Sequence, residues 1–477
     1  MNYGQFLQMI PEAFLVLSLI LVFFADFCLM KSERKNSVLS KLTGALLISL
    51  LLLSTTATPA VLFGGMYVVG LAANVMKIIL TLGTLIVVIM AQPWLDNENR
   101  KYAGEFYMLT LSTLLGMFIM VSSGNFLLFF LGLETASVPM ACMVALDKWK
   151  KKSAEGAAKY ILTATFSSGV MLYGLSFVYA AAGTLYFDEV ATALTARSAV
   201  AIMGLVFFFS GLGFKLSLVP FHFWTADTYE GAPTPVTGYL SVVSKGAAAF
   251  ALMAIFLKAF APLIEYWEYL LYIVIVLSIT IANLFAIRQS ELKRFMAFSS
   301  ISQAGYIMLA VIGASQTGMA ALMYYVLVYV VANMAVFTVI STVEQNNGGT
   351  TIMSSYDGLY QTNPKLAFLM TLALFSLAGI PPFAGMFSKF FVFMAAAQQG
   401  SFWAYFVVFI ALVNTVVSLY YYLLIVKAMY IKQTDTPLPA FKTDANTRLA
   451  LVICTAGIAL FGICSCIYDY LFSASAL

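Results

Sequence analysis

The sequence has a single histidine, His222, and only 10% of its 477 residues are charged. Haem and most copper or non-haem iron sites rely on histidine ligands, and iron–sulfur clusters rely on grouped cysteines. The five cysteines lie in apolar stretches and form no CxxC pair, and neither GxGxxG nor a Walker A pattern occurs. We therefore expect no redox centre, no metal site and no nucleotide site in this chain.

Hydrophobic residues make up 62% of the chain. Soluble domains carry about a quarter charged residues, so this composition indicates a polytopic membrane protein. The net charge of +4 indicates little about partners, and we expect no nucleic-acid partner.

Apolar runs of about 20 residues mark helices that can cross a bilayer. Fourteen such spans are predicted, and the seventh and the twelfth are interrupted by prolines. The spans lie near residues 10–30, 42–58, 68–91, 105–121, 125–146, 156–182, 198–224, 234–260, 268–287, 295–313, 318–342, 365–397, 402–426 and 448–472.

Basic residues alternate between the connections of these spans. Eighteen of the 25 lysines and arginines follow odd-numbered spans, whereas only Arg197 and Lys258 follow even-numbered ones. Because basic residues favour the cytoplasmic side, we expect 31–41 and 148–153 to be cytoplasmic and both termini to face outward. The predicted location is the bacterial inner membrane, with the termini on the periplasmic side.

The remaining five of the 25 basic residues are lysines, and all of them fall inside predicted spans. One acid, Glu134, lies at the middle of the fifth span. A charge at the bilayer centre costs roughly 2.5–3.5 kcal/mol, so six of them cost on the order of 15–20 kcal/mol. Such a cost favours an ion path over a scaffold. The five lysines are Lys77, Lys159, Lys215, Lys245 and Lys389.

Structural alternatives stay open for three of the ionisable residues. Lys77 and Lys159 could extend to an interface or pair with a carboxylate. His222, next to Pro220, could hydrogen-bond the interrupted backbone instead of relaying protons.

The two interruptions are similar but not identical. Pro382-Phe383 aligns with Pro220-Phe221, yet Lys215 precedes its break and Lys389 follows its own. This pattern predicts inverted repeats. The expected fold is an all-α polytopic membrane protein of about 14 transmembrane helices with two inverted five-helix repeats. Its parts are 1–104 (three helices), 105–260 and 261–430 (the repeats) and 431–477 (span 14).

Four stretches resemble a known family: residues 157–184, 220–248 (PFHFWTADTYEGAPTPVTGYLSVVSKGAA), 292–306 (LKRFMAFSSISQAGY) and 379–390 (GIPPFAGMFSKF). On these motifs the chain resembles the N subunits of bacterial proton-pumping NADH:quinone oxidoreductase (respiratory complex I), within the antiporter-like, Mrp-type subunit family. The resemblance covers about residues 100–430.

The resemblance assigns roles to the isolated charges. It implies proton transfer by Glu134, Lys215, Lys245 and Lys389, with Glu134 tuning the proton affinity of Lys215. Lys159, His222 and Lys293 correspond to polar relay positions. Ala226 departs from the family, which often has proline there.

The resemblance also implies that flavin, iron–sulfur clusters and the quinone site belong to partner subunits. The expected function is proton translocation through buried Lys, Glu, His and water, coupled to quinone reduction elsewhere in the complex. The implied partners are other membrane and peripheral subunits, lipid, protons and water. A multisubunit Mrp-type cation/proton antiporter, a substrate carrier and a scaffold that no longer pumps remain as alternatives.

Overall fold

The computed structural model describes residues 3–97, 100–194, 198–432, 434, 437–464 and 466–475. Within these residues, thirteen helices are long and apolar enough to cross a membrane. The remaining predicted span, the twelfth (365–397), consists of two shorter helices, α16 and α17. The predicted spans and the interruption of the seventh and twelfth are therefore confirmed.

Most spans are single helices. They are α1 (Ile10–Cys28), α2 (Lys35–Thr56), α3 (Leu71–Asn97), α4 (Ala103–Val121), α5 (Phe126–Val144), α6 (Lys151–Ala182), α12 (Ile264–Ile287), α13 (Leu292–Ile312), α14 (Gln316–Asn346), α18 (Phe402–Tyr430) and α19 (Ala445–Ile463).

The other spans are composite. Their parts are α8 (Ala199–Leu216) with α9 (Phe223–Gly231), α10 (Thr234–Tyr239) with a π-helical turn η4 (Leu240–Ser244) and α11 (Lys245–Lys258), and α16 (Pro364–Ala378) with α17 (Ala384–Ala397).

Short elements connect the spans. They are η1 (Tyr3–Gln8), β1 (Ala60–Leu62), η2 (Phe63–Gly65), β2 (Tyr67–Val69), η3 (Arg100–Tyr102), α7 (Phe187–Ala193), η5 (Ala261–Leu263), η6 (Met353–Tyr356), α15 (Leu359–Thr362) and α20 (Cys466–Ala474). β1 and β2 pair antiparallel, with Val61 opposite Val68.

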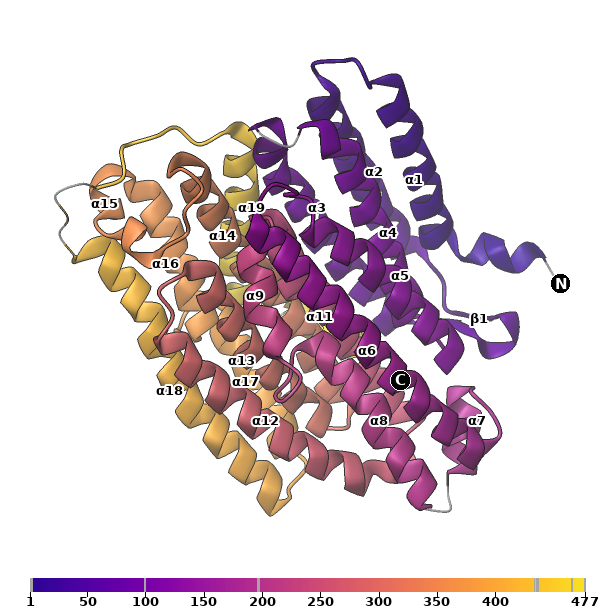
Figure 1. Cartoon of the computed structure of the whole chain (residues 1–477). Coiled ribbons are helices and arrows are strands. Elements are labelled where there is room, and N and C mark those ends of the chain that lie inside the picture. Colours follow the sequence, from indigo (N-terminus) through magenta and orange to yellow (C-terminus); the bar gives the residue numbers. More distant parts are fainter. Residues whose placement is uncertain are drawn as a thin grey trace.

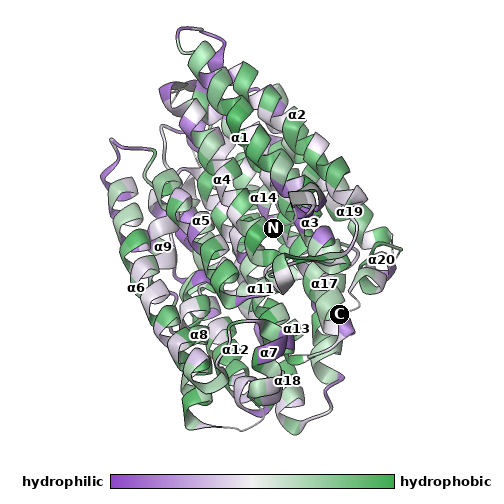
Figure 2. Cartoon of the chain, turned by 90° about the vertical axis from the view of Figure 1, so that its right-hand side faces the viewer, coloured by the Kyte–Doolittle hydropathy of each residue, from purple (hydrophilic) through white to green (hydrophobic). Residues whose placement is uncertain are grey.

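Hydrophobic residues cover the helices, whereas hydrophilic residues gather at their ends (Figure 2). The turn between α1 and α2 and the elements α15 and α16 lie toward the upper end in Figure 1, and α7 lies at the lower end. We call the end with the turns after α1, α3, α5 and α18 the basic end. Several helices extend beyond their apolar runs there, so Lys35, Lys151 and Lys293 are helical.

The centre of the bundle is formed by α13 and α14, which are buried on all sides. By contrast, α1, α2 and α18 expose most of their apolar surface, including Phe24 and Val416. In a membrane this surface faces lipid or neighbouring chains. The inverted relation of 105–260 to 261–430 stays a prediction.

Lys77 of α3 is buried against α1. Its Nζ lies 2.8 Å from Glu12 Oε1 and donates a hydrogen bond of 3.0 Å to the Tyr67 hydroxyl. The geometry therefore matches the pairing alternative for Lys77: the pair fastens α1 to α3.

Lys77→Met is expected to destabilise the protein by roughly 3–5 kcal/mol, because it leaves the buried Glu12 carboxylate without its cation. The midpoint of thermal unfolding in detergent measures this loss. The double change Glu12→Gln with Lys77→Met is expected to recover most of it. Equal loss in the single and double variants would contradict the coupling.

The topology makes a separate prediction. In a background whose five cysteines are serine, cysteines at Ser32 and Ser473, which are both exposed, are expected to react with an impermeant reagent from opposite sides of the membrane. Ser32 lies on the basic end and is expected to face the cytoplasm. Labelling of both from the same side would contradict the predicted topology.

Candidate functional site

The break between α8 and α9 is held by side chains from other helices. Ser217 ends α8 in the left-handed region at φ 61°. Trp224 Nε1 donates to the Phe214 carbonyl over 3.1 Å, and the Val219 N–H donates to Ser278 Oγ of α12 over 2.9 Å. An interrupted helix inside a membrane requires such internal partners, so the break is a fixed part of the fold.

Lys215 lies in the last turn of α8, directly before this break, and is 4% exposed. Its Nζ donates to Ser137 Oγ of α5 over 2.9 Å and to the Tyr160 hydroxyl of α6 over 3.2 Å. Both acceptors are neutral hydroxyl groups, so the buried amine has no carboxylate among these contacts.

Glu134 lies one turn before Ser137 on α5 and is half-buried. Its carboxylate accepts a short hydrogen bond from the Ser168 hydroxyl of α6. Within the described residues, no ion pair of 4.0 Å or less joins Glu134 to Lys215. Lys215 of α8 thus contacts Ser137, one turn from Glu134 on α5, and not Glu134 itself.

Lys245 begins α11, directly after the π-helical turn η4, and is 2% exposed. Its Nζ donates to Ser300 Oγ of α13 over 2.8 Å and lies 5.5 Å from the centre of the Tyr229 ring. The Tyr229 hydroxyl is 3.3 Å from the same Ser300 oxygen. A π-helical turn next to a buried lysine is typical of functional sites.

Lys389 lies in α17, beyond the second break. Its Nζ donates to the Ala378 carbonyl at the end of α16 over 2.9 Å and lies 5.0 Å from the centre of the Tyr306 ring. Beside it is a small cavity of about 10 Å³, which Gln303 and Tyr329 also line. A cavity of this size holds about one water molecule.

Polar side chains of α13 and α14 lie between Lys245 and Lys389. Ser300 of α13 contacts Lys245. Gln303 lies less than one turn further along α13 and accepts a short hydrogen bond from Tyr325 of α14. Asn333 of α14 donates to Ser241 Oγ of η4 over 2.7 Å. Ser300 and Gln303 lie within the family-like motif 292–306, but no charge distinguishes them in the sequence, so neither was predicted as a site residue.

His222 lies in the break, at the N-terminus of α9, where its ring stacks on Phe223. Its Nδ1 is buried and has no hydrogen-bond partner among the described residues. Within the described ranges, no hydrogen bond joins His222 to Lys215, Lys245 or Lys389, so its relay role stays a prediction.

Lys159 occupies a different environment from the other lysines. Its side chain is 42% exposed and pairs with Glu155 and with Asp227 of α9, each at 2.6 Å. Arg294 of α13 also binds Asp227, at 2.6 Å. The Asp227 carboxylate accepts hydrogen bonds from both Lys159 and Arg294. This ion-pair network joins α6, α9 and α13 near the basic end.

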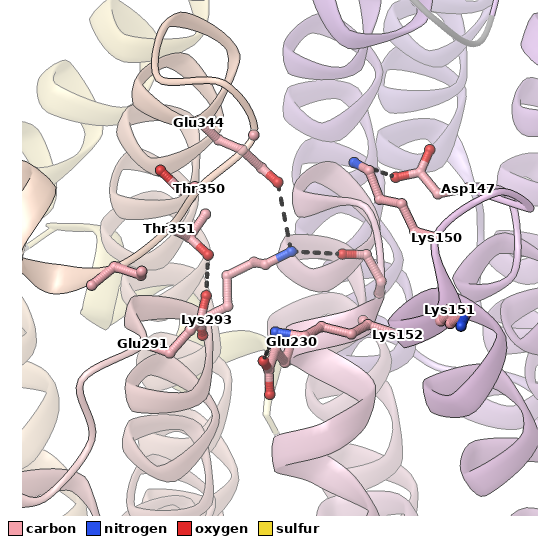
Figure 3. Close-up of a pocket in the computed structure, with 14 residues that line it drawn as sticks. Asp147, Lys150, Lys151, Lys152, Glu230, Glu291, Lys293, Glu344, Thr350 and Thr351 are labelled. Atoms are coloured by element: carbon pink, nitrogen blue, oxygen red, sulfur yellow. Dashed lines mark hydrogen bonds and ion pairs between the residues drawn. The ribbon is translucent and has the colours of Figure 1, made fainter.

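Lys293 lies at a cavity of about 370 Å³ on the basic end (Figure 3). Its Nζ donates to the Ala232 carbonyl over 3.0 Å and lies 3.8 Å from Glu344 Oε1. Across the cavity, Lys152 binds Glu230 at 2.6 Å. Burial raises the pKa of the Glu291 carboxyl, which also lines the cavity, above its ordinary value. The cavity therefore offers groups that bind protons.

In the described part of the chain, no group of three or more His, Cys, Asp or Glu side chains could hold a metal ion. The candidate site consists instead of buried amines, hydroxyls and Glu134.

Residues 123–418 match the family described as "NADH:quinone oxidoreductase/Mrp antiporter, TM". NADH-quinone oxidoreductase subunit N of Phocaeicola vulgatus is 57% identical to the chain over 478 residues and is covered completely, as is the chain. The subunit of the same name from Azobacteroides pseudotrichonymphae is 48% identical, with 99% of this chain and 98% of that protein covered.

Solved structures agree in fold. A chain of respiratory complex I from Thermus thermophilus with bound aureothin has 29% identity and a TM-score of 0.81, with 97% of this chain and 99% of that chain covered. A chain of the Mrp complex from Dietzia sp. DQ12-45-1b has a TM-score of 0.85 at 18% identity, with 98% and 97% covered, which shows the fold alone. By its identity over the whole length to these relatives, the chain belongs to the NADH-quinone oxidoreductase subunit N family.

Proposed function

We propose that the chain is the proton-translocating subunit N of an NADH-quinone oxidoreductase. Buried lysines, Glu134 and water would carry protons across the bacterial inner membrane while other subunits, which hold the flavin, iron–sulfur clusters and quinone site, reduce quinone. The observation that carries the proposal is the set Lys215, Lys245 and Lys389. In the described ranges, these almost fully buried amines have no carboxylate within 4.0 Å.

Buried charges of this kind are expensive and mark ion paths in membrane proteins. Each of the three contacts a hydroxyl or a carbonyl, and each lies at an irregular part of a span: before a break, after a π-helical turn, or beyond a break. The proposed path begins at the cavity beside Lys293, passes Lys215 and Lys245, and continues through Ser300 and Gln303 to Lys389. Water would complete the links that side chains do not make.

Glu134 gives the path a means of control. A carboxylate near a buried lysine favours the protonated amine, whereas burial alone favours the neutral one. In the present arrangement Glu134 is bound to Ser168. Movement of its carboxylate past Ser137 toward Lys215 would load the lysine, and return to Ser168 would release the proton toward Lys245.

This control predicts that Glu134 and Lys215 act on one step. Glu134→Gln is expected to impair proton transfer because Lys215 then loses its proton too readily, while Glu134→Asp is expected to be mild. The double change Glu134→Gln with Lys215→Ala is expected to be scarcely worse than Lys215→Ala alone. Quinone-linked proton uptake by reconstituted complex is measured for all four variants. If the losses in the two single variants multiply in the double variant, the residues do not act on a common step.

The alternative function is a subunit of a multisubunit Mrp-type antiporter, which shares the fold. The named relatives at 57% and 48% identity favour the oxidoreductase. Affinity purification of the tagged chain from native membranes, followed by mass spectrometry, tests the choice. Flavin- and iron–sulfur-containing partners are expected; a complex of membrane antiporter subunits without them would overturn the proposal.

The remaining relay positions carry less of the proposal. Lys293 would accept protons from the cavity, and His222 would serve the break with its buried Nδ1. We assign Lys159 to holding α9 through Asp227 more than to direct transfer, because its side chain is exposed and paired with two carboxylates.

A further inference from the structure

A second cavity, of about 590 Å³, lies on the basic end where α16 and α19 begin. Three basic residues line it: Lys365 in the first turn of α16, Lys442 before α19, and Arg448 in the first turn of α19. None of the three belongs to the proposed proton path. We call this cavity the α16/α19 groove.

The charge of the groove is of one sign. All three basic side chains belong to exposed residues, and no aspartate or glutamate is found among the described residues that line the cavity. Within the described residues, none of the three forms an ion pair of 4.0 Å or less, although Asp444 lies nearby at the start of α19. The described residues therefore do not neutralise this cationic lining, which favours an anion.

The groove is shaped by specific contacts. Asn363 donates from Nδ2 to the Pro439 carbonyl over 3.2 Å and accepts from the Phe441 N–H over 3.3 Å, so it holds the segment before α19 against the start of α16. Arg448 Nε donates to Thr443 Oγ1 over 3.1 Å. A guanidinium has five N–H donors, so this bond orients Arg448 and leaves most of its donors for a ligand.

Two helix N-termini also point their dipoles at this place. Pro364, the first residue of α16, has no N–H, but the N–H groups that follow it and those at the start of α19 have no partners within their own helices. The positive end of a helix dipole stabilises phosphate. This contribution adds to the three side-chain charges.

The other half of the lining is apolar. Leu369, Leu451 and Val452 extend from the charged mouth along α16 and α19 toward the middle of the membrane, and Val452 is 62% exposed. A free phosphate ion would use only the charged mouth. An amphiphile with an anionic head and acyl chains matches both halves.

We propose that the α16/α19 groove binds an anionic phospholipid, with its phosphodiester at Lys365, Lys442 and Arg448 and its acyl chains along Leu369, Leu451 and Val452. Basic pockets between transmembrane helices on the cytoplasmic side recognise such headgroups. The site is independent of the proton path, and its ligand would fix the start of α19 to the start of α16.

The test uses the membrane complex purified in detergent through a tag on this chain. The groove variant carries Lys365→Gln, Lys442→Gln and Arg448→Gln. A matched control carries Lys31→Gln, Arg34→Gln and Lys41→Gln, which removes three exposed charges from the same end. Native mass spectrometry and thermal unfolding are followed while phosphatidylglycerol, phosphatidylcholine or inorganic phosphate is added to delipidated complex.

Phosphatidylglycerol is expected to bind and to raise the unfolding midpoint of the parent complex and the control. Its affinity is expected to fall roughly 100-fold in the groove variant, since each basic residue near the surface contributes about a factor of five. Equal binding to the groove variant and the control, equal binding of phosphatidylcholine, or equal stabilisation by inorganic phosphate would each overturn the proposal.

Discussion

Replacing Lys215 by alanine is expected to abolish most proton transfer through this chain, because alanine cannot carry a proton. In the parent protein, the Lys215 amine of α8 donates to the hydroxyls of Ser137 on α5 and Tyr160 on α6. The alanine variant lacks this amine and both hydrogen bonds. Proton uptake by complex reconstituted in liposomes, followed with a pH-sensitive dye after NADH addition, measures the effect.

A matched control separates proton transfer from packing. Ser137→Ala removes one hydrogen bond of Lys215 but keeps the amine, so it is expected to retain most proton uptake. Complex with Lys215→Ala is expected to keep its subunits, as judged by gel filtration. Normal uptake in Lys215→Ala would remove this lysine from the path, whereas equal loss in both variants would assign Lys215 to packing.

Replacing Lys245 by alanine is expected to cause an equally large loss of proton transfer. Lys245 occupies the middle of the proposed path, between Lys215 and the polar side chains of α13 and α14, and the hydroxyl of Ser300 is its acceptor. The span has two lysines, and alanine at position 245 removes the one that is buried at mid-depth. Lys258, at the end of the same helix α11 and half-buried, supplies the control.

The spans were predictable because a bilayer demands about 20 apolar residues from each helix. Their ends were less predictable. The predicted second span began at residue 42, yet α2 begins at Lys35, and α14 continues to Asn346. Helix hydrogen bonds continue past the hydrocarbon layer into polar sequence, where hydropathy gives no signal.

The charged members of the site were predictable for a similar reason. Lys215, Lys245 and Lys389 are expensive in an apolar span, so their positions are conspicuous in the sequence. The hydroxyl partners were not. The partners are Ser137, Tyr160 and Ser300, and these residue types are common in membrane helices. Serine can also satisfy its hydroxyl by a hydrogen bond to the backbone of its own helix. Only the packing of α5, α6 and α13 makes them neighbours of the lysines.

Lys159 and Glu134 show that the position of a residue along its own helix does not predict which side chains it contacts. Lys159 and Lys215 are both lysines in predicted spans, but Lys159 turns toward Asp227 and solvent. Glu134 was expected beside Lys215 and instead contacts Ser168. Side-chain direction depends on how neighbouring helices rotate, and that information is absent from hydropathy and charge.

The ratio of protons translocated to electron pairs transferred, measured in liposomes with complex carrying Lys245→Ala, tests the proton path most directly. NADH oxidation and proton uptake are recorded on the same sample, beside parent complex and complex carrying Lys258→Ala. The account predicts a clearly lower ratio for Lys245→Ala and the parent ratio for Lys258→Ala. A parent ratio in Lys245→Ala would contradict a path through the buried lysines.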